Sequence, residues 1–419
     1  MESSTAVFDP NLSSPNLSSG SQSSTSVPGS SLSKPVVFDV GGLVSRMAKL
    51  TDSRHRRGKR YRLEHVLLLL TLAKLCGQDT PRAIAHWVRL RKRHLVKLIG
   101  LPRHSVPHQN TYRRITEQVV DPEQLERTVK EFFGDLPKAG RSVLISIDGK
   151  VMRGTISAEK PKGTYLLAAY LPEEGIVLMQ VEAGSKENEI TMAPKLMECI
   201  DLRGKVVGGD AEQTQRQLSL RILEAGGEYL WTVKDNQPTL REDIERLFAS
   251  ADEPTVLGGK VPNDFESFKT VGKDHGRLET RQITVSSSLK GYLDWPGAEQ
   301  VAKIERNRVE IKTGKQRHEI AYVITSQTRD KASPEGLLHQ NRTYWGIENG
   351  LHHRRDTTFQ EDSLHATRGN TGRVIAIINN LAIGLLSYTG QTNHAEARRE
   401  FCAHPHRALR LLTTSPRRL

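Results

Sequence analysis

The spacing of hydrophobic positions changes near residue 140 of this chain. Before that point apolar residues recur at helical intervals, as in RLEHVLLLLTLAKLCG and RAIAHWVRLRKRHLVKLIG. The second run has apolar side chains largely on one face, Trp87 among them, and basic side chains around the rest. Asp79-Thr80-Pro81 before it supplies a cap and a first-turn proline. We expect compact helices joined by short turns over residues 41–137, with Trp87 in their core.

Beyond residue 138 the pattern favours strands. RSVLISID, TYLLAAYL and GIVLMQVEA are apolar runs of strand length, and a Pro-Glu-Glu-Gly turn joins the last two as a hairpin. The helix NEITMAPKLMECI, the strand KVVGGD, the helix QTQRQLSLRILEAGG and the strand YLWTVK follow. The order is β-β-β-α-β-α-β, with three antiparallel strands first and crossover helices between the later ones. It predicts an α/β domain over residues 138–390.

Three further segments differ from that order. Residues 250–330 contain alternating runs such as RQITVSS and EIAYVITS, which predict a β-rich insertion. Two helices should follow it, the long EGLLHQNRTYWGIENGLHHRRD and the almost wholly apolar core helix GRVIAIINNLAIGLLSYT. Residues 1–40 form a serine-rich leader that we expect to be disordered, and residues 391–419 form a basic tail.

The charge of the chain lies mainly in its helical region. The whole chain has a formal net charge of +13, whereas residues 46–114 contain eighteen Lys and Arg against three acids, a local +15. Such a concentration favours a polyanionic partner, most often nucleic acid. Basic residues also enter a helix at NTYRR, as in a helix-turn-helix DNA reader. A solvated basic helical bundle is the alternative.

Other function classes are excluded by composition. No stretch approaches the roughly 18 apolar residues that cross a bilayer, and the first residues lack a signal-peptide pattern, so we expect a cytoplasmic protein. Cys76, Cys199 and Cys402 offer neither a disulfide framework nor a metal-binding pair. We expect each to be a small buried apolar residue.

Two acids, Asp148 and Asp210, each end a buried strand. If these strands are neighbours, the carboxylates converge at the sheet edge, where a divalent cation such as Mg²⁺ relieves their repulsion. Two such ions can activate the attacking oxygen and stabilise the leaving oxygen of a phosphodiester. Glu348, with His352 four residues later, is the best candidate for a third carboxylate. The alternative is that the two Asp residues are turn or cap residues.

Two alternatives concern the long helix. His352, His353 and Asp356 raise the possibility of zinc, but HHRRD lacks the usual histidine spacing. Trp345 could stack on a displaced base or pack in the core.

At this point the motifs resemble a known family. SIDGKVMRG, KENEI, VVGGDAEQTQ, KDNQ, HGRLETR, LDWPG and YWGIENGLHHRRDTTFQED are similar, in this order, to transposases of H-repeat-associated insertion sequences. These form a branch of the insertion-sequence-four group of DDE transposases. LTDSRHRRGKRYRLEHVLLLL, AIAHW and LPRHSVPHQNTYRRI resemble the helical domain that precedes the catalytic domain there. The resemblance extends from about residue 45 to about residue 390.

The resemblance implies an α/β fold with an RNase H-like catalytic core and a β-rich insertion, preceded by a helical, helix-turn-helix-like DNA-binding domain. It implies that Asp148, Asp210 and Glu348 are the catalytic acids and hold two Mg²⁺ (or Mn²⁺) ions. The expected partners are transposon ends and target DNA, bound by a homodimer in the synaptic complex. The expected location is the prokaryotic cytoplasm, in association with the nucleoid.

The sequence departs from the wider group around Glu348. Asn341 stands at the position of that group's Tyr, Tyr344 at the position of its Arg and Arg355 at the position of its Lys. Contacts to DNA ends cannot be transferred to Asn341 or Tyr344. If Arg355 keeps the role of the Lys, seven residues of α-helix should direct its guanidinium into the cleft of Glu348.

The expected DNA-binding cations lie in several segments: Arg56, Arg57, Lys59, Arg60, Arg113, Arg114, Lys150, Arg153, Arg277 and Arg355. Surface solvation is the alternative for Lys150 and Arg153. In HGRLETR, His275, Arg277 and Arg281 could grip DNA or form a structural ion-pair cluster.

Three functions remain open. The leading hypothesis is a transposase that binds terminal inverted repeats, hydrolyses the end phosphodiester and joins the freed 3′-hydroxyl to target DNA. The second is a catalytically silent DNA-binding descendant, which the intact acids disfavour and the altered residues around Glu348 favour. A general nuclease or resolvase leaves the large basic helical region harder to explain.

Overall fold

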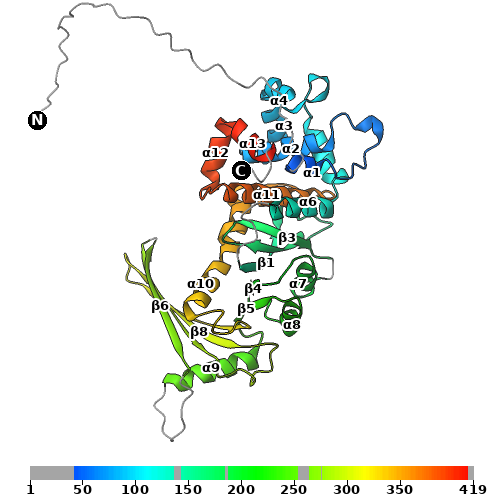
Figure 1. Ribbon diagram of the computed structural model, residues 1–419. Helices are drawn as coiled ribbons and strands as arrows, with labels where there is room; N and C mark the ends of the chain where they lie inside the picture. The colour runs from blue at the N-terminus through cyan, green and yellow to red at the C-terminus, as the bar shows by residue number, and fades with distance from the viewer. Residues whose placement is uncertain (1–41, 136–142, 185–186, 253–263, 275, 414–419) are drawn as a thin grey trace, which may run out of the picture.

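The protein is built around one large sheet with helices on both faces (Figure 1). The computed structural model describes residues 42–135, 143–184, 187–252, 264–274 and 276–413. The expected leader therefore lies outside the described residues. The nine strands follow the order β3-β2-β1-β4-β5-β9-β8-β7-β6.

The first five strands form the half of the sheet that carries Asp148, within β1, and Asp210, directly after β4. β1 (Leu144–Met152), β2 (Thr164–Leu171) and β3 (Ile176–Glu182) are antiparallel. β4 (Val206–Gly209) and β5 (Glu228–Val233) continue from β1 in parallel pairs. The helices α7 (Glu189–Glu198) and α8 (Arg216–Glu224) connect them. The predicted order β-β-β-α-β-α-β is confirmed for this half.

The pleat of β1 divides its side chains between two cores. Ile145 and Ile147 pack with α7, α8 and the insertion helix α9 (Pro238–Asp252). Leu144 packs on the opposite face with α10 (Pro334–Tyr344) and α11 (Thr371–Tyr388). Because side chains alternate along a strand, Asp148 belongs to the second face, where α10 lies.

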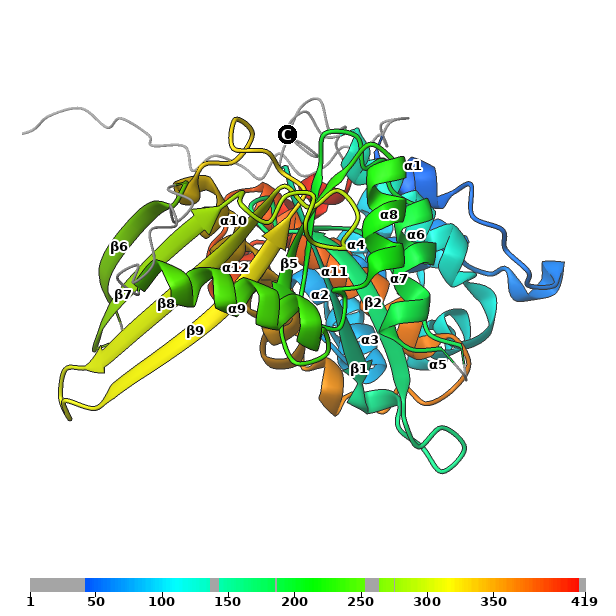
Figure 2. The same ribbon diagram turned by 90° about the horizontal axis from the view of Figure 1, so that it is seen from below.

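The β-rich insertion extends the same sheet. Its strands are β6 (Glu266–Asp274), β7 (Arg277–Ser286), β8 (Gln300–Glu310) and β9 (Gln316–Thr325). β9 pairs antiparallel with β5, so the insertion shares a continuous hydrogen-bonded ladder with the first five strands. Figure 2 shows the β8–β9 hairpin projecting beyond the rest of the molecule.

The helical region begins with α1 (Leu43–Met47), α2 (Leu63–Leu75) and α3 (Pro81–Leu90). It continues with α4 (Lys92–Ile99), α5 (Gln109–Arg114) and α6 (Pro122–Gly134). The Thr80 side chain caps α3 and Pro81 occupies its first turn, as the sequence indicates. The prediction of a single helix over RAIAHWVRLRKRHLVKLIG is wrong. The backbone leaves helical geometry at Arg91, which separates α3 from α4. Trp87 is buried, as expected.

The apolar helix α11 joins the helical region to the sheet. It packs on α6, α2 and β3, and one hydrophobic cluster includes residues of all four elements. The expectation that no stretch approaches a membrane-spanning length is wrong, because among the described residues α11 is the one helix long and apolar enough to cross a membrane; 78% of that span is buried inside the protein. Its apolarity therefore fits its central position in the core.

The basic tail is folded up to residue 413. α12 (His394–Ala403) and α13 (Pro405–Thr413) pack against α2. Arg398 of α12 is buried, lies 2.7 Å from Asp79 and stacks at 4.2 Å over the ring of Phe359. Of the three cysteine thiols, all free, Cys76 is buried and Cys199 and Cys402 are partly buried.

Candidate active site

The expectation that Asp148 ends its strand is wrong, because β1 continues to Met152 and Asp148 pairs with Ala168 of β2, whereas Asp210 directly follows β4. Both acids lie where β4 ends beside β1, a place called here the sheet edge. Ser146 of β1 pairs with Gly208 of β4 in a parallel register, so Asp148 and Asp210 each lie two residues beyond that pair, on the same face. One carboxylate oxygen of Asp210 accepts the backbone N–H groups of Glu212 and Gln213, at 2.9 and 3.3 Å. Burial, together with the negative charge of Asp148, raises the pKa of Asp210 although those two backbone contacts oppose the shift.

Glu348 reaches the same edge from the helix that crosses this face. Beyond α10 the helical run widens into the π-helical segments η5 (Glu348–His352) and η6 (Arg354–Thr358). π-helical turns inside helices occur frequently at functional sites. One ligand atom each from Asp148, Glu348 and His352 lie within 4.8 Å of one another. The Nε2 atom of His352 lies 3.2 Å from Oδ2 of Asp148.

A fourth carboxylate, Glu189, was not predicted. It lies in the first turn of α7, and Gln213 donates a hydrogen bond to it at 2.8 Å. Burial raises the pKa of Glu189 to about 7, and the charges of Asp148, Glu212 and Asp210 add to the shift. Glu189 belongs to the KENEI motif of the resemblance, but the sequence alone does not indicate that it approaches the two Asp residues.

Gly149 explains how Glu189 approaches β1. A Cβ atom at this position would lie 1.6 Å from Oη of Tyr165 and 2.5 Å from Oε1 of Glu189. Only glycine leaves space for both side chains beside the strand. The glycine of IDGK is therefore a packing requirement of this edge.

The two aromatic residues before Glu348 have different environments. Tyr344 is buried against Gly208, and burial together with the surrounding carboxylates raises its pKa. Because Tyr344 is buried, it does not present a side chain to DNA, in agreement with the expectation that a DNA contact cannot be transferred to this position. Trp345 is 52% exposed, so its interpretation as a core residue is wrong. Stacking on a base remains open for it. Asn341 is partly buried in α10.

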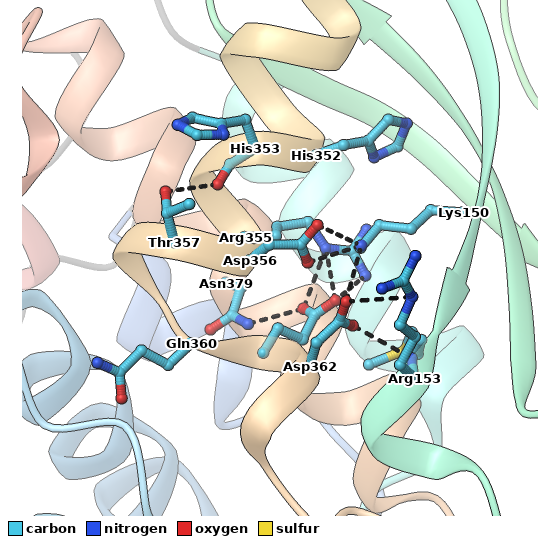
Figure 3. Close-up of polar contacts among 12 residues, drawn as sticks. Lys150, Arg153, His352, His353, Arg355, Asp356, Thr357, Gln360, Asp362 and Asn379 are labelled. Carbon is cyan, nitrogen blue, oxygen red and sulfur yellow. Dashed lines mark hydrogen bonds and ion pairs between the residues drawn. The ribbon is translucent and has the colours of Figure 1, made fainter.

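The two cations that follow Asp148, Lys150 and Arg153, differ in exposure and in their partners (Figure 3). Lys150 points toward the π-helical segment η6 and the turn η7 (Glu361–Ser363), and its Nζ lies 2.6 Å from Asp356 of η6 and 3.7 Å from Asp362 of η7. With its side chain 10% exposed, Lys150 is a poor candidate for a DNA contact. Arg153 has an exposed side chain with a long 3.9 Å contact to Asp362, and it can reach a phosphate.

Arg355 lies elsewhere than the sequence suggests. The expectation that its guanidinium faces the cleft of Glu348 is wrong, because the side chain is 0% exposed and pairs with buried Glu361 at 2.7 Å. The expectation assumed an unbroken α-helix, whereas η5 and η6 are π-helical and change the angle between the two positions. Asn379 of α11 donates to the same Glu361 carboxylate at 2.8 Å.

His352, His353 and Asp356, the three residues considered as zinc ligands from the sequence, do not point to one common site. His353 is exposed, and Figure 3 shows its ring on the side of the helix away from His352. Asp356 is paired with Lys150. His352 alone of the three residues joins the acids at the sheet edge.

The cations of HGRLETR divide between two environments. Arg281 pairs with Glu279 at 2.6 Å, and Arg306 and Arg308 from the neighbouring strand contact the same carboxylate. Arg281 therefore belongs to a structural ion-pair cluster, the second of the two alternatives. Arg277 is exposed at the start of β7. It lines a pocket of about 420 Å³ together with Arg308, Glu310, Lys315 and Arg317. His275 lies outside the described residues.

The expected DNA-binding cations of the helical region are all exposed: Arg56, Arg57, Lys59, Arg60, Arg113 and Arg114. The first four lie on and after the short helix η1 (Arg56–Gly58). Arg60 reaches Ser105 at 3.1 Å, so this loop lies against the segment that leads into α5. Arg113 and Arg114 occupy the last turn of α5.

The donor atoms at the sheet edge fit a divalent cation. Carboxylate oxygens of Asp148, Asp210 and Glu348 are the hard ligands that Mg²⁺ and Mn²⁺ accept. Burial and the negative charge of Asp148 raise the pKa of Asp210, and a cation bound beside these carboxylates would relieve that repulsion. An additional buried imidazole completes the donor set.

Comparison with known proteins identifies relatives along most of the chain. A family model described as Transposase DDE domain matches residues 139–385, and one described as DDE_Tnp_1-associated matches residues 44–133. The protein named "Putative transposase YncI" of Escherichia coli O157:H7 is 29% identical over 356 residues, which cover 83% of this chain and 88% of the relative. The "H repeat-associated putative transposase YhhI" of Escherichia coli K12 is 25% identical, covering 82% and 90%.

One solved structure is also similar over much of its length. It is a piggyBac transposase synaptic complex with hairpin DNA, at 15% identity and a TM-score of 0.40, covering 90% of this chain and 78% of that chain.

Proposed function

Because the chain belongs to the family of the transposase DDE domain, we propose that it acts as the DNA transposase of an insertion sequence. It binds the terminal inverted repeats, hydrolyses the phosphodiester at each end and transfers the freed 3′-hydroxyl to target DNA. The observation that supports the proposal is the group formed by Asp148, Glu348 and His352, whose ligand atoms lie within 4.8 Å of one another, with Asp210 just beyond the neighbouring strand β4.

The proposed catalytic core is RNase H-like. The order of its first five strands, three antiparallel and two added in parallel, supports this assignment. The rigid sheet edge and the helix hold the three carboxylates at fixed positions, so that the reacting phosphate meets a preorganised site. Two divalent cations bound there would supply activation of the attacking oxygen and stabilisation of the leaving oxygen.

The helical region is the proposed DNA-end reader, with a helix-turn-helix-like arrangement. The exposed cations at η1 and at the end of α5 support phosphate contacts, which position a protein on duplex DNA. Arg153 and Arg277 are proposed to touch DNA nearer to the cut site and along the insertion. The synaptic assembly is proposed to be a homodimer that holds two transposon ends and a target, in the cytoplasm at the nucleoid.

The alternative is a DNA-binding protein that has lost cleavage. Lys150, which is largely covered, and Arg355, which is buried, are not among the proposed DNA contacts. The assembled carboxylates favour an active enzyme. A general nuclease would need no sequence-specific reader and leaves the basic helical region without a role.

The test uses the DNA that flanks the gene. We expect terminal inverted repeats there, and purified protein with Mg²⁺ should cleave at their outer ends and join the 3′-ends to a plasmid. Binding without cleavage in Mg²⁺ and in Mn²⁺ would support the silent descendant. Cleavage of unrelated DNA at the same rate would support a nuclease.

A further inference from the structure

Within the part of the chain that the structure describes, His352 is a buried side chain without a hydrogen-bond partner. Its residue is 4% exposed, and neither ring nitrogen has a hydrogen-bonding partner among the described residues. The 3.2 Å contact of Nε2 with Asp148 lacks hydrogen-bond alignment. An unsatisfied buried polar group costs about 1–3 kcal/mol, so a histidine kept in this state needs a further partner.

The distances around His352 suit a cation. Two ligands that each lie about 2.0–2.3 Å from one ion are separated by up to about 4.5 Å. One donor atom each from Asp148, Glu348 and His352 fall within 4.8 Å of one another, so small rotations bring all three onto a single ion. Asp210 does not belong to this group of atoms.

We propose that His352 is a ligand of the divalent cation held between Asp148 and Glu348. This inference rests on the proposed function, in which the acids bind metal. The centre then has one position with oxygen ligands, between Asp148 and Asp210, and one with mixed nitrogen and oxygen ligands.

The position with mixed nitrogen and oxygen ligands, between Asp148 and Glu348, discriminates between divalent cations. Imidazole nitrogen suits Mn²⁺ and later transition metals, whereas Mg²⁺ favours oxygen ligands. The Asp148–Glu348 position therefore binds Mn²⁺ more tightly than Mg²⁺, and His352 accounts for most of that difference. Its neighbour His353, exposed on the other side of the helix, makes no contribution (Figure 3).

The test measures the bound ion directly in the full-length protein. With Mn²⁺ bound, pulsed electron paramagnetic resonance should detect a directly coordinated ¹⁴N nucleus. His352→Gln should abolish that signal and weaken Mn²⁺ binding about tenfold or more, with a smaller loss of Mg²⁺ affinity. His353→Gln is the matched control and should leave signal and affinity unchanged.

The outcomes separate this inference from the proposed function. Absence of a ¹⁴N signal in the unchanged protein, or its persistence in His352→Gln, overturns the ligand assignment even if DNA is cut. An equal loss of Mg²⁺ and Mn²⁺ affinity without a ¹⁴N signal means that His352 only orients Asp148, which also overturns it. A ¹⁴N signal in a protein that does not cut its ends leaves the ligand assigned and refutes the transposase. The melting temperature of each variant shows whether it folds, and His352→Asn is a second variant that can be measured if His352→Gln does not fold.

Discussion

The guanidinium of Arg355 donates from Nε and Nη2 to the carboxylate of Glu361 at 2.7–3.0 Å, and both side chains are buried. The Arg355 guanidinium is therefore not exposed at the surface. Asn379 of α11 contacts the same carboxylate, so the pair links the π-helical segment η6 to the core helix. The position that resembles a DNA contact in the wider family is here a structural ion pair.

The first prediction concerns the stability of this pair. Removing one partner leaves the other charge buried and unpaired, which costs about 3–5 kcal/mol. We expect Arg355→Ala to lower the free energy of unfolding by that amount in a urea titration. Arg354→Ala, at a partly exposed position, should change it by less than about 1 kcal/mol. An Arg355→Ala protein of normal stability that no longer binds its ends would show that Arg355 serves DNA after all.

The second prediction concerns the three acids. Asp148→Asn, Asp210→Asn and Glu348→Gln should each reduce end cleavage by at least about a thousandfold, because each removes a negative ligand from the proposed metal centre. Binding to the ends should change less than about threefold, since the proposed reader lies in the helical region. Gel-shift and cleavage assays on the same preparations separate the two effects. Parallel loss of binding and cleavage would make the acids structural.

The sequence predicted the sheet better than the helices around the site. The apolar runs that end at Asp148 and Asp210 predict the strands β1 and β4, and the parallel pairing of these two strands brings the acids to neighbouring positions. The conversion of the long helix to π-helical turns leaves no mark in hydrophobic spacing, so Arg355 was assigned to the wrong environment. Glu189 was missed because its chemistry depends on a glycine in a distant strand.

The third prediction concerns DNA binding by the loop around η1. Each cation that neutralises a phosphate contributes about 0.9 to the slope of log affinity against log salt. Arg56→Gln and Arg57→Gln should therefore each lower that slope by about one unit and weaken binding to all sequences similarly. Arg203→Gln is the control, because Arg203 is exposed near the opposite end of β4 from Asp210. Unchanged slopes for both test variants would assign these arginines to the solvated surface.

Substitution is preferable to deletion in this experiment. α2 and α6 share a hydrophobic cluster with α11, so removal of residues 1–135 would expose the core helix. The truncated protein should aggregate, and its failure to bind DNA would carry no information about recognition.

The fourth prediction concerns pH. Burial raises the pKa of Glu126, on α6, from 4.5 to about 8, although the charge of Arg373 opposes the shift. The folded protein thus holds this proton more tightly than the unfolded chain. Protonated Glu126 therefore contributes to the free energy of unfolding. This contribution is complete below about pH 4.5 and is lost as the pH rises through about 8.

A substitution isolates that contribution. Glu126→Gln keeps the shape of the protonated acid and cannot ionise, so its melting temperature should fall less than that of the unchanged protein between pH 6 and about 9. Glu131→Gln, at an exposed position of the same helix, is the control. Parallel pH profiles for all three proteins would contradict the raised pKa.

The last prediction concerns Glu189, the carboxylate that the sequence left without a role. It interacts electrostatically with Asp148 and Asp210, and the Gln213 amide holds it in place. A divalent cation at the sheet edge would stabilise its negative form, and the loss of groups that support metal ligands typically weakens affinity 10- to 100-fold. We expect Glu189→Gln to weaken Mg²⁺ binding by about that factor in calorimetry without DNA. Glu198→Gln, at the exposed opposite end of α7, should leave it unchanged. Because Gln keeps the size of the side chain beside Gly149, a large fall in melting temperature is not expected. Unchanged or tighter Mg²⁺ binding in Glu189→Gln would remove this carboxylate from the metal environment and leave it a packing partner of β1.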